Sequence, residues 1–169
     1  MNLKSLIRDI PDFPKKGIIF KDITTLWMDP KGLKTSTDEL AKRYKDKGIN
    51  KIVAAESRGF IVGTPLAYLI GAGFVPVRKP GKLPYKVISE SYDLEYGSDT
   101  LTIHEDAIKP GEKVLIVDDL IATGGTIEAI IKLVEKLGGE VIEVCALVEL
   151  SFLKGRERIN KPIFNLIEY

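Results

Sequence analysis

The sequence predicts an α/β protein whose core is an open, mainly parallel twisted sheet flanked by helices. Short apolar runs rich in Val and Ile, typical of buried parallel strands, alternate with segments whose apolar residues recur at helical spacing. This βαβ order places helices on both faces of a parallel sheet. The chain of 169 residues has the length and composition of one domain with a substantial core.

The elements of the sheet layer are identified by their length, their composition and the residues that interrupt them. Strands are expected at Lys51–Ala55, Phe74–Val77, Lys113–Val117 and Val141–Val148. Helices are expected at Pro30–Lys47, Ile61–Ile70 and Thr126–Leu137. The first of these helices should turn Leu33, Leu40 and Tyr44 toward the core and end at Gly48, because glycine is common just beyond helix C-termini.

Two regions lie outside this alternation. The first ten residues have apolar side chains at helical spacing and predict a short amphipathic helix, which Pro11 and Pro14 would stop. A loop and a short extended piece, Ile18–Phe20, follow. Residues 78–110 are rich in charge, Gly and Pro, and within them Leu94–Tyr96 and Leu101–His104 are expected to form an antiparallel hairpin. A long insertion of this kind is usually a lid or a flexible loop.

The bulk composition excludes several classes of partner. The 25 basic and 24 acidic residues are well mixed and leave a net charge of +1, so no global field attracts nucleic acid or an anionic membrane. No apolar run has the length of a spanning helix, and charges interrupt the start of the chain where a signal peptide needs an apolar core. We therefore expect a cytoplasmic protein. Cys145, the only cysteine, is expected to be a buried structural thiol, and His104 to face solvent.

The most informative segment begins at the apolar run 114–117. Two acids, Asp118 and Asp119, follow it, and then a Thr/Gly loop leads into the helix that begins at Thr126. The carboxyl end of a parallel strand is where open α/β sheets bind ligands. Free backbone N–H groups at the helix start suit a phosphate, and the carboxylates suit vicinal sugar hydroxyls. This pattern predicts a sugar-phosphate site; the alternative is an ordinary capped connection without a ligand.

Four further segments have residue types that suit an anionic nucleotide precursor. Residues 56–60 again join a strand to a helix, and Arg58 offers a planar fork for a diphosphate, although a capped turn with a surface arginine is an equal alternative. Residues 78–84 form a basic loop that can close over an anion, or a solvated charge run. Glu95 can exchange a proton with a base, or be an exposed acid. Phe20 can stack on a purine, or be a core residue.

Taken together and in this order, the five segments resemble the adenine phosphoribosyltransferases, which are type I phosphoribosyltransferases. The likeness extends from Ile10 to Leu150. It implies one phosphoribosyltransferase domain over 1–169, with an N-terminal hood at about 1–30 and a flexible loop and hairpin at about 79–110. The family acts in purine salvage: it makes AMP from adenine and 5-phosphoribosyl 1-diphosphate, releases diphosphate with Mg²⁺ present, and usually forms a homodimer.

The resemblance also implies residue roles. Asp118 and Asp119 match the acceptors of the ribose hydroxyls, and the 5′-phosphate loop is Ala122, Thr123, Gly124, Gly125 and Thr126. The diphosphate contacts are Ser57, Arg58 and Lys82, with Arg78 and Lys79 near the mobile loop, where they can reach a partner subunit. Phe20 would stack on adenine, Lys21 would contact it through its backbone, and Glu95, beside Tyr96, would handle the proton on the base. We assign no direct metal ligand, because Mg²⁺ keeps waters and substrate oxygens as ligands.

The choice of base depends on a weaker argument. Relatives that use 6-oxopurines carry an acid where this chain has Ala122, so adenine is favoured. Two alternatives stay open: a phosphoribosyltransferase for xanthine or another purine, and a non-catalytic regulator that binds phosphoribosyl diphosphate. A regulator of that kind would carry a DNA-binding module, for which this chain has no spare length.

Overall fold

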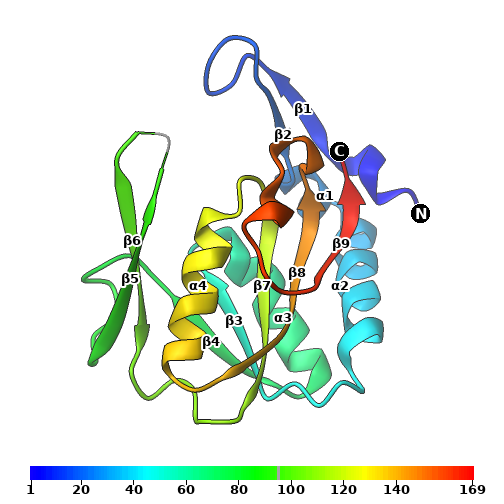
Figure 1. Ribbon diagram of the computed structural model, residues 1–169. Coiled ribbons are helices and arrows are strands. Elements are labelled where there is room, and N and C mark those ends of the chain that lie inside the picture. Colours follow the sequence, from blue (N-terminus) through cyan, green and yellow to red (C-terminus); the bar gives the residue numbers. More distant parts are fainter. Residues whose placement is uncertain (95) are drawn as a thin grey trace.

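A five-stranded parallel sheet forms the centre of the protein. In the computed structural model, which describes residues 1–94 and 96–169, the strand order is β4-β3-β7-β8-β9 (Figure 1). The strands are β3 (Lys51–Ala55), β4 (Gly73–Val77), β7 (Lys113–Ile121), β8 (Glu140–Glu149) and β9 (Ile163–Glu168). All neighbouring strands in this sheet are parallel and its edges are not closed on each other. The predicted fold class is therefore confirmed.

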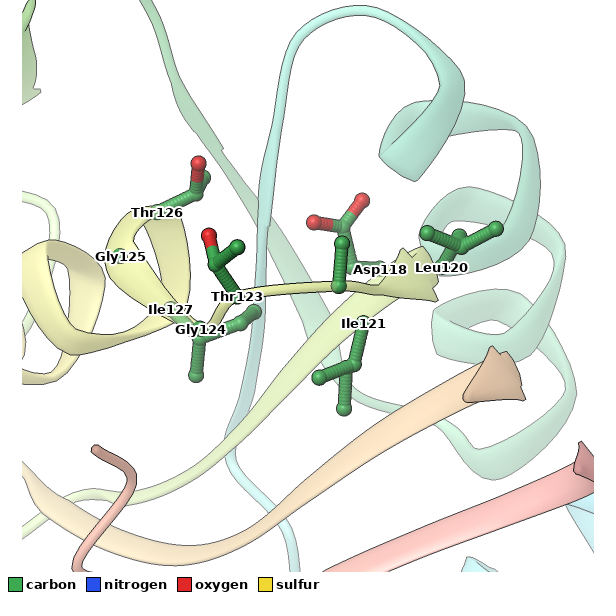
Figure 2. Close-up of a pocket in the computed structure, with 9 residues that line it drawn as sticks. Asp118, Leu120, Ile121, Thr123, Gly124, Gly125, Thr126 and Ile127 are labelled. Carbon is green, nitrogen blue, oxygen red and sulfur yellow. The ribbon is translucent and has the colours of Figure 1, made fainter. Parts of the chain in front are cut away.

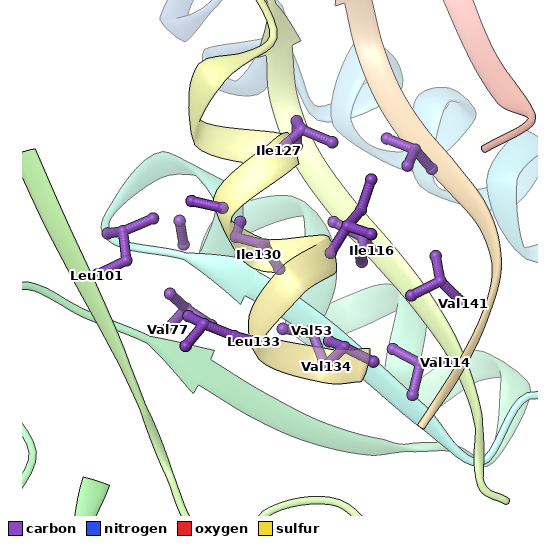
Figure 3. Close-up of a cluster of buried hydrophobic side chains, with 14 of the residues drawn as sticks. Val53, Val77, Leu101, Val114, Ile116, Ile127, Ile130, Leu133, Val134 and Val141 are labelled. Carbon is purple, nitrogen blue, oxygen red and sulfur yellow. The ribbon is translucent and has the colours of Figure 1, made fainter. Parts of the chain in front are cut away.

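Helices cover both faces of the sheet because its central strands are apolar on both sides. Helix α4 (Gly125–Lys136) packs on one face, and α2 (Pro30–Tyr44) and α3 (Arg58–Ile70) pack on the other. Along β7, Val114 and Ile116 meet the α4 side, as Figure 3 shows, whereas Leu115 belongs to the opposite cluster. Burial of these side chains is the main stabilising term, at about 1.5–3 kcal/mol for each large apolar residue.

The N-terminal segment folds differently from the prediction. Only a short 3-10 helix, η1 (Leu3–Leu6), forms in the first ten residues, and β1 (Arg8–Pro11) then pairs antiparallel with β2 (Ile19–Asp22). The predicted amphipathic helix is wrong, because ten residues make a marginal helix whereas pairing with β2 satisfies the same backbone groups. An ion pair between Arg8 and Asp22, 2.6 Å long, ties the two strands together. Figure 1 shows this hairpin, the hood, projecting from one end of the sheet.

The insertion between β4 and β7 is a second antiparallel hairpin. Its strands are β5 (Val87–Asp93) and β6 (Ser98–His104), which lie beside α4 in Figure 1. The prediction placed one arm correctly at Leu101–His104, but the other arm was wrong: Leu94 lies in the turn, where its N–H donates to the Gly97 carbonyl. The sequence did not predict β5 because its inward positions include polar residues. Its side chains alternate in burial, but they do not alternate between apolar and polar residues.

Two predicted side-chain orientations are also wrong. Leu33 is exposed, and the inward stripe of α2 consists of Gly32, Ser36, Leu40 and Tyr44. The small residue Gly32 at the start of this stripe allows the helix to approach Leu26 and Leu6 closely. The ring of His104 packs edge-on against Tyr85, with centroids 6.1 Å apart, and its Nε2 atom is buried, so this residue does not simply face solvent.

Three connecting elements complete the fold. They are α1 (Thr24–Met28) and two short 3-10 helices, η2 (Ser151–Leu153) and η3 (Gly155–Glu157). The last two carry the chain from β8 back past the carboxyl edge of the sheet to β9. Over the part of the chain that the structure describes, every helix is too short or too polar to cross a membrane.

Cys145 is buried, as predicted, at the side of the sheet covered by α2. Its thiol contacts Tyr44, and burial raises the pKa of that thiol to about 12. The Tyr44 hydroxyl donates to the Glu143 carboxylate at 2.6 Å, and Arg43 donates to the same carboxylate at 2.8 and 3.1 Å. This buried network fastens α2 to β8 and lies on the side of the sheet away from α4.

Candidate active site

The two predicted acids belong to the end of a strand rather than to the loop beyond it. Strand β7 continues to Ile121, so Asp118 and Asp119 belong to the carboxyl-terminal part of this strand. A cavity of about 90 Å³, the loop cavity, opens where β7 meets α4. It is lined by Asp118, Leu120, Ile121, Ala122, Thr123, Gly124, Gly125, Thr126 and Ile127. Figure 2 shows the oxygen atoms of Asp118, Thr123 and Thr126 on one side of this segment, with Ile121 pointing to the other.

The turn at Gly124 brings the start of α4 to this cavity. Gly124 has a φ of +87°, which L side chains rarely adopt, and the carbonyl of Gly155 lies only 2.7 Å from where a Cβ would be. Gly155 is equally constrained, since its own Cβ would stand 2.5 Å from the Ala122 carbonyl. The loop can therefore take its course only because two glycines meet. The first N–H groups of α4, which have no helical partner, end beside the cavity.

The second predicted loop lies next to the first. Strands β3 and β7 are paired neighbours, with Ala54 opposite Val117, so the residues that follow β3 stand beside Asp118. The peptide bond between Glu56 and Ser57 is cis, and α3 begins at Arg58. A second cavity, of about 270 Å³, joins the two loops. This inter-loop cavity is lined by Ala55, Glu56, Ser57, Arg58, Gly59, Asp118, Asp119, Leu120, Ala122 and Thr126.

The acids and the arginine of this cavity form a coupled group of charges. The Nε atom of Arg58 lies 3.0 Å from Oδ2 of Asp119, which is buried. Burial raises the pKa of Asp118, and the neighbouring Asp119 carboxylate raises it further. Burial also raises the pKa of Asp119, against the opposing pull of Arg58. Two carboxylates held close together in this way favour a ligand that brings hydroxyl donors or positive charge.

The basic loop starts at the rim of the inter-loop cavity. Glu56, to which the sequence assigned no role, accepts a hydrogen bond from the backbone N–H of Lys79 at 2.7 Å and pairs with Arg78 at 3.3 Å. These contacts, the Lys79 N–H first and the Arg78 side chain after it, hold the pKa of Glu56 below its usual value in spite of partial burial. The Lys79 ammonium pairs with Asp99 of β6. Lys82 is exposed and, like Arg78 and Lys79, lines neither cavity.

An apolar hollow of about 670 Å³, the hood hollow, separates β2 from the chain after β8. It is lined by Lys4, Gly17, Ile18, Ile19, Lys21, Leu150, Phe152, Leu153 and Tyr169. Lys21, one of the two residues that the resemblance assigned to the base, lines this hollow. Phe20 does not line the hollow, because neighbouring residues of a strand face opposite ways, and its ring packs edge-on against Phe13 with centroids 5.2 Å apart.

The hood hollow and the loop cavity are close together because of the segment after β8. Leu153 lines the hollow, and Gly155, two residues later, touches Ala122 and Gly124. Arg156 anchors the segment by donating two hydrogen bonds to the buried Glu149 carboxylate, at 2.7 and 2.6 Å. Sequence reasoning missed this wall, for which the run Lys154-Gly155-Arg156 was the available signal. Glu95, the predicted proton-handling acid, lies outside the described residues.

These features define a class: an α/β protein that binds a sugar phosphate at the carboxyl edge of a parallel sheet, with an apolar hollow beside it. The phosphoribosyl transferase domain family matches residues 29–168. An adenine phosphoribosyltransferase of Solidesulfovibrio magneticus is 60% identical over 159 residues, which are 94% of this chain and 93% of that protein.

Two solved structures give the same result. A crystal structure of adenine phosphoribosyltransferase from Thermoanaerobacter pseudethanolicus has a TM-score of 0.95 and 54% identity, and the match covers 99% of this chain and 98% of that one. The Saccharomyces cerevisiae protein, complexed with an imino-altritol bisphosphate and adenine, has a TM-score of 0.92 and 43% identity over 97% of this chain and 96% of its own. The chain belongs to the phosphoribosyltransferase family and, within it, to the adenine phosphoribosyltransferases.

Proposed function

We propose that this chain transfers the 5-phosphoribosyl group from 5-phosphoribosyl 1-diphosphate to adenine, giving AMP and diphosphate in purine salvage. The observation that carries the proposal is the continuity of three sites. The loop cavity suits a 5′-phosphate, the inter-loop cavity suits a ribose and its diphosphate, and the hood hollow beyond Gly155 suits a flat apolar base. A donor bound across the first two would leave the third for the base.

The charges of the inter-loop cavity suit the reaction. Breaking the bond between C1′ and diphosphate develops positive charge on the sugar and negative charge on the leaving group, so catalysis is mainly preorganised electrostatics. Arg58 and Ser57 stand where they can take up the leaving diphosphate, and Lys82, Arg78 and Lys79 would join them as the basic loop closes. Exclusion of water then protects the reacting sugar from hydrolysis.

The acids also fit a role for Mg²⁺. The close carboxylates of Asp118 and Asp119, with pKa values raised by burial, would be stabilised by a cation carried in on the diphosphate. When bound, Mg²⁺ would neutralise charge on the leaving group. Because this ion keeps substrate oxygens and waters as ligands, contact with either acid through water suffices, and no direct protein ligand is proposed.

The base would occupy the hood hollow. Ile19 and Leu153 supply apolar contact, and the backbone of Lys21 supplies polar contacts to the edge of the ring. Stacking by Phe20, predicted from the sequence, stays a prediction that would require its ring to turn toward the hollow, which it does not line in this structure. Proton handling by Glu95 also stays a prediction. An uncharged residue at Ala122 favours adenine over 6-oxopurines. One domain over 1–169, assembly as a homodimer and a cytoplasmic location complete the proposal.

The test is turnover with a panel of bases. The purified protein is incubated with 5-phosphoribosyl 1-diphosphate and Mg²⁺ plus adenine, hypoxanthine, guanine or xanthine, and both nucleotide and diphosphate are quantified. We expect AMP from adenine, and nucleotide from the other bases at less than about one hundredth of that rate. Donor binding without turnover of any base would identify a phosphoribosyl-diphosphate-binding regulator instead.

A further inference from the structure

We infer that Tyr92 is a positioning residue for the donor: its hydroxyl orients the Thr126 hydroxyl toward the 5′-phosphate and links that event to Lys79 of the basic loop. The inference rests on the proposed function, because it assumes that a phosphate occupies the loop cavity. Tyr92 lies on β5, in the hairpin that stands beside α4 (Figure 1), and the sequence motifs assign it no role.

The ring of Tyr92 is held at a defined place against the start of α4. Its Cδ2 atom lies 3.3 Å from where a Cβ on Gly125 would be, so the ring rests on this glycine. The ring also packs against the apolar cluster beneath α4. An ion pair of 2.5 Å between Glu90 and Lys136 fastens the same strand to the same helix. The phenol therefore cannot move far without moving the hairpin.

The hydroxyl of Tyr92 stands between Thr126 and Asp99: it accepts a hydrogen bond from the Thr126 hydroxyl and donates its own proton to the Asp99 carboxylate. It lies 3.5 Å from Oγ1 of Thr126 and 3.4 Å from Oδ2 of Asp99, whose carboxylate also pairs with Lys79. Because a phenol has only one proton to donate, it can donate to Asp99, as it does here, or to Thr126, but not to both. These are long contacts that a small shift of the hairpin would tighten on one side or the other.

Phosphate binding decides between the two arrangements. When Thr126 gives its proton to a phosphate oxygen, its own oxygen becomes a better acceptor, and the phenol proton turns to it from Asp99. The Oδ2 atom of Asp99 then loses the phenol and keeps Lys79 as its side-chain partner. Occupancy of the 5′-phosphate end of the donor is thereby coupled to the basic loop that is proposed to cover its diphosphate end.

The experiment compares Tyr92→Phe, which keeps the ring and removes only the hydroxyl, with Tyr68→Phe on the exposed face of α3. We measure kcat, the KM for each substrate, and the Kd of ribose 5-phosphate by calorimetry. For Tyr92→Phe we expect the donor KM and the ribose 5-phosphate Kd to rise about fivefold to tenfold, with kcat and the adenine KM within about twofold. The control variant should match the wild type in every value.

A double-mutant cycle separates this role from simple packing. In a Thr126→Ala background, where the partner hydroxyl is absent, Tyr92→Phe should change the ribose 5-phosphate Kd by less than about twofold. An equal change in both backgrounds, or no change in the wild-type background, would overturn the inference. Failure of the proposed function is a distinct result, because the wild-type protein itself would then make no nucleotide.

Discussion

The meeting of Gly124 with Gly155 predicts a large effect from a single methyl group. In Gly124→Ala the new Cβ would lie 2.7 Å from the Gly155 carbonyl oxygen, with two more backbone atoms of that residue at 3.3 and 3.4 Å. An alanine at this positive φ costs about 1–2 kcal/mol. Overlap with backbone, which cannot rotate away, adds about 1–3 kcal/mol. Gly111→Ala is a matched control, because its φ of +84° is nearly the same and nothing lies within 4 Å of its Cβ position.

The difference between the two variants measures the contact itself. We expect Gly124→Ala to melt about 4–8 °C below Gly111→Ala, which corresponds to about 2 kcal/mol in a domain of this size. The donor KM should rise more than about tenfold in Gly124→Ala only, because the phosphate loop must shift to relieve the overlap. Calorimetry and steady-state kinetics on both proteins provide the data. Equal melting temperatures would refute the argument that close approach, rather than backbone conformation alone, requires glycine here.

Four further predictions follow from other parts of the molecule. Asp119→Asn should raise the donor Kd more than about tenfold in calorimetry, because an amide accepts hydrogen bonds from ribose hydroxyls less well than a carboxylate does. The melting temperature should not fall, because the substitution removes a buried charge. An unchanged Kd would remove this residue from the ribose site. Leu153→Ala should raise the adenine KM about tenfold by loss of apolar contact and leave the donor KM unchanged, and equal effects on both would place the base elsewhere. Glu95→Gln should lower kcat more than it changes either KM, and an unaltered rate across pH would count against proton handling. Burial by itself would raise the pKa of Glu143. Hydrogen bonds from Arg43 and, after it, from Tyr44 outweigh burial and hold this pKa below its ordinary value of 4.5. Its contribution to stability is therefore present at neutral pH and is lost as the pH falls through the lowered pKa, so Arg43→Gln should move the midpoint of acid unfolding, followed by circular dichroism, to higher pH.

The parts of the site that the sequence predicted are contiguous in the chain. The acids at 118 and 119 lie at the end of one strand, and the loop from Ala122 to Thr126 leads from that strand into one helix, so local rules for strand ends and helix starts place them together. The second loop, at Arg58, obeys the same rules. Parallel neighbours end at the same edge of a sheet, and for this reason two motifs that lie sixty positions apart meet in one cavity.

The parts that the sequence did not predict depend on contacts between distant segments. Whether residues 1–10 form a helix or a strand is decided by pairing with Ile19–Asp22, which overrides a weak local preference. The wall of the hood hollow depends on the pairing of β9 with β8, because Leu153 lies in the segment that connects these two strands. Side-chain direction is equally non-local: Phe20 and Lys21 are neighbours in sequence, yet only Lys21 faces the hollow.

The pairing of Arg58 with Asp119 shows how the site is prepared for its substrate. The cation proposed for the leaving diphosphate is held at 3.0 Å by the acid proposed for the ribose, and burial has raised the pKa of that acid. Neither charge has its best partner until the donor arrives, when hydroxyl groups can take the carboxylate and diphosphate oxygens can take the guanidinium. Exchange of one internal ion pair for two contacts to the ligand costs less desolvation than burial of the donor against unpaired charges. The same exchange explains why the Arg58 loop and the Asp119 strand end share a cavity. In separate sites each could bind one half of the donor, but binding of one half could not free the charged side chain that binds the other.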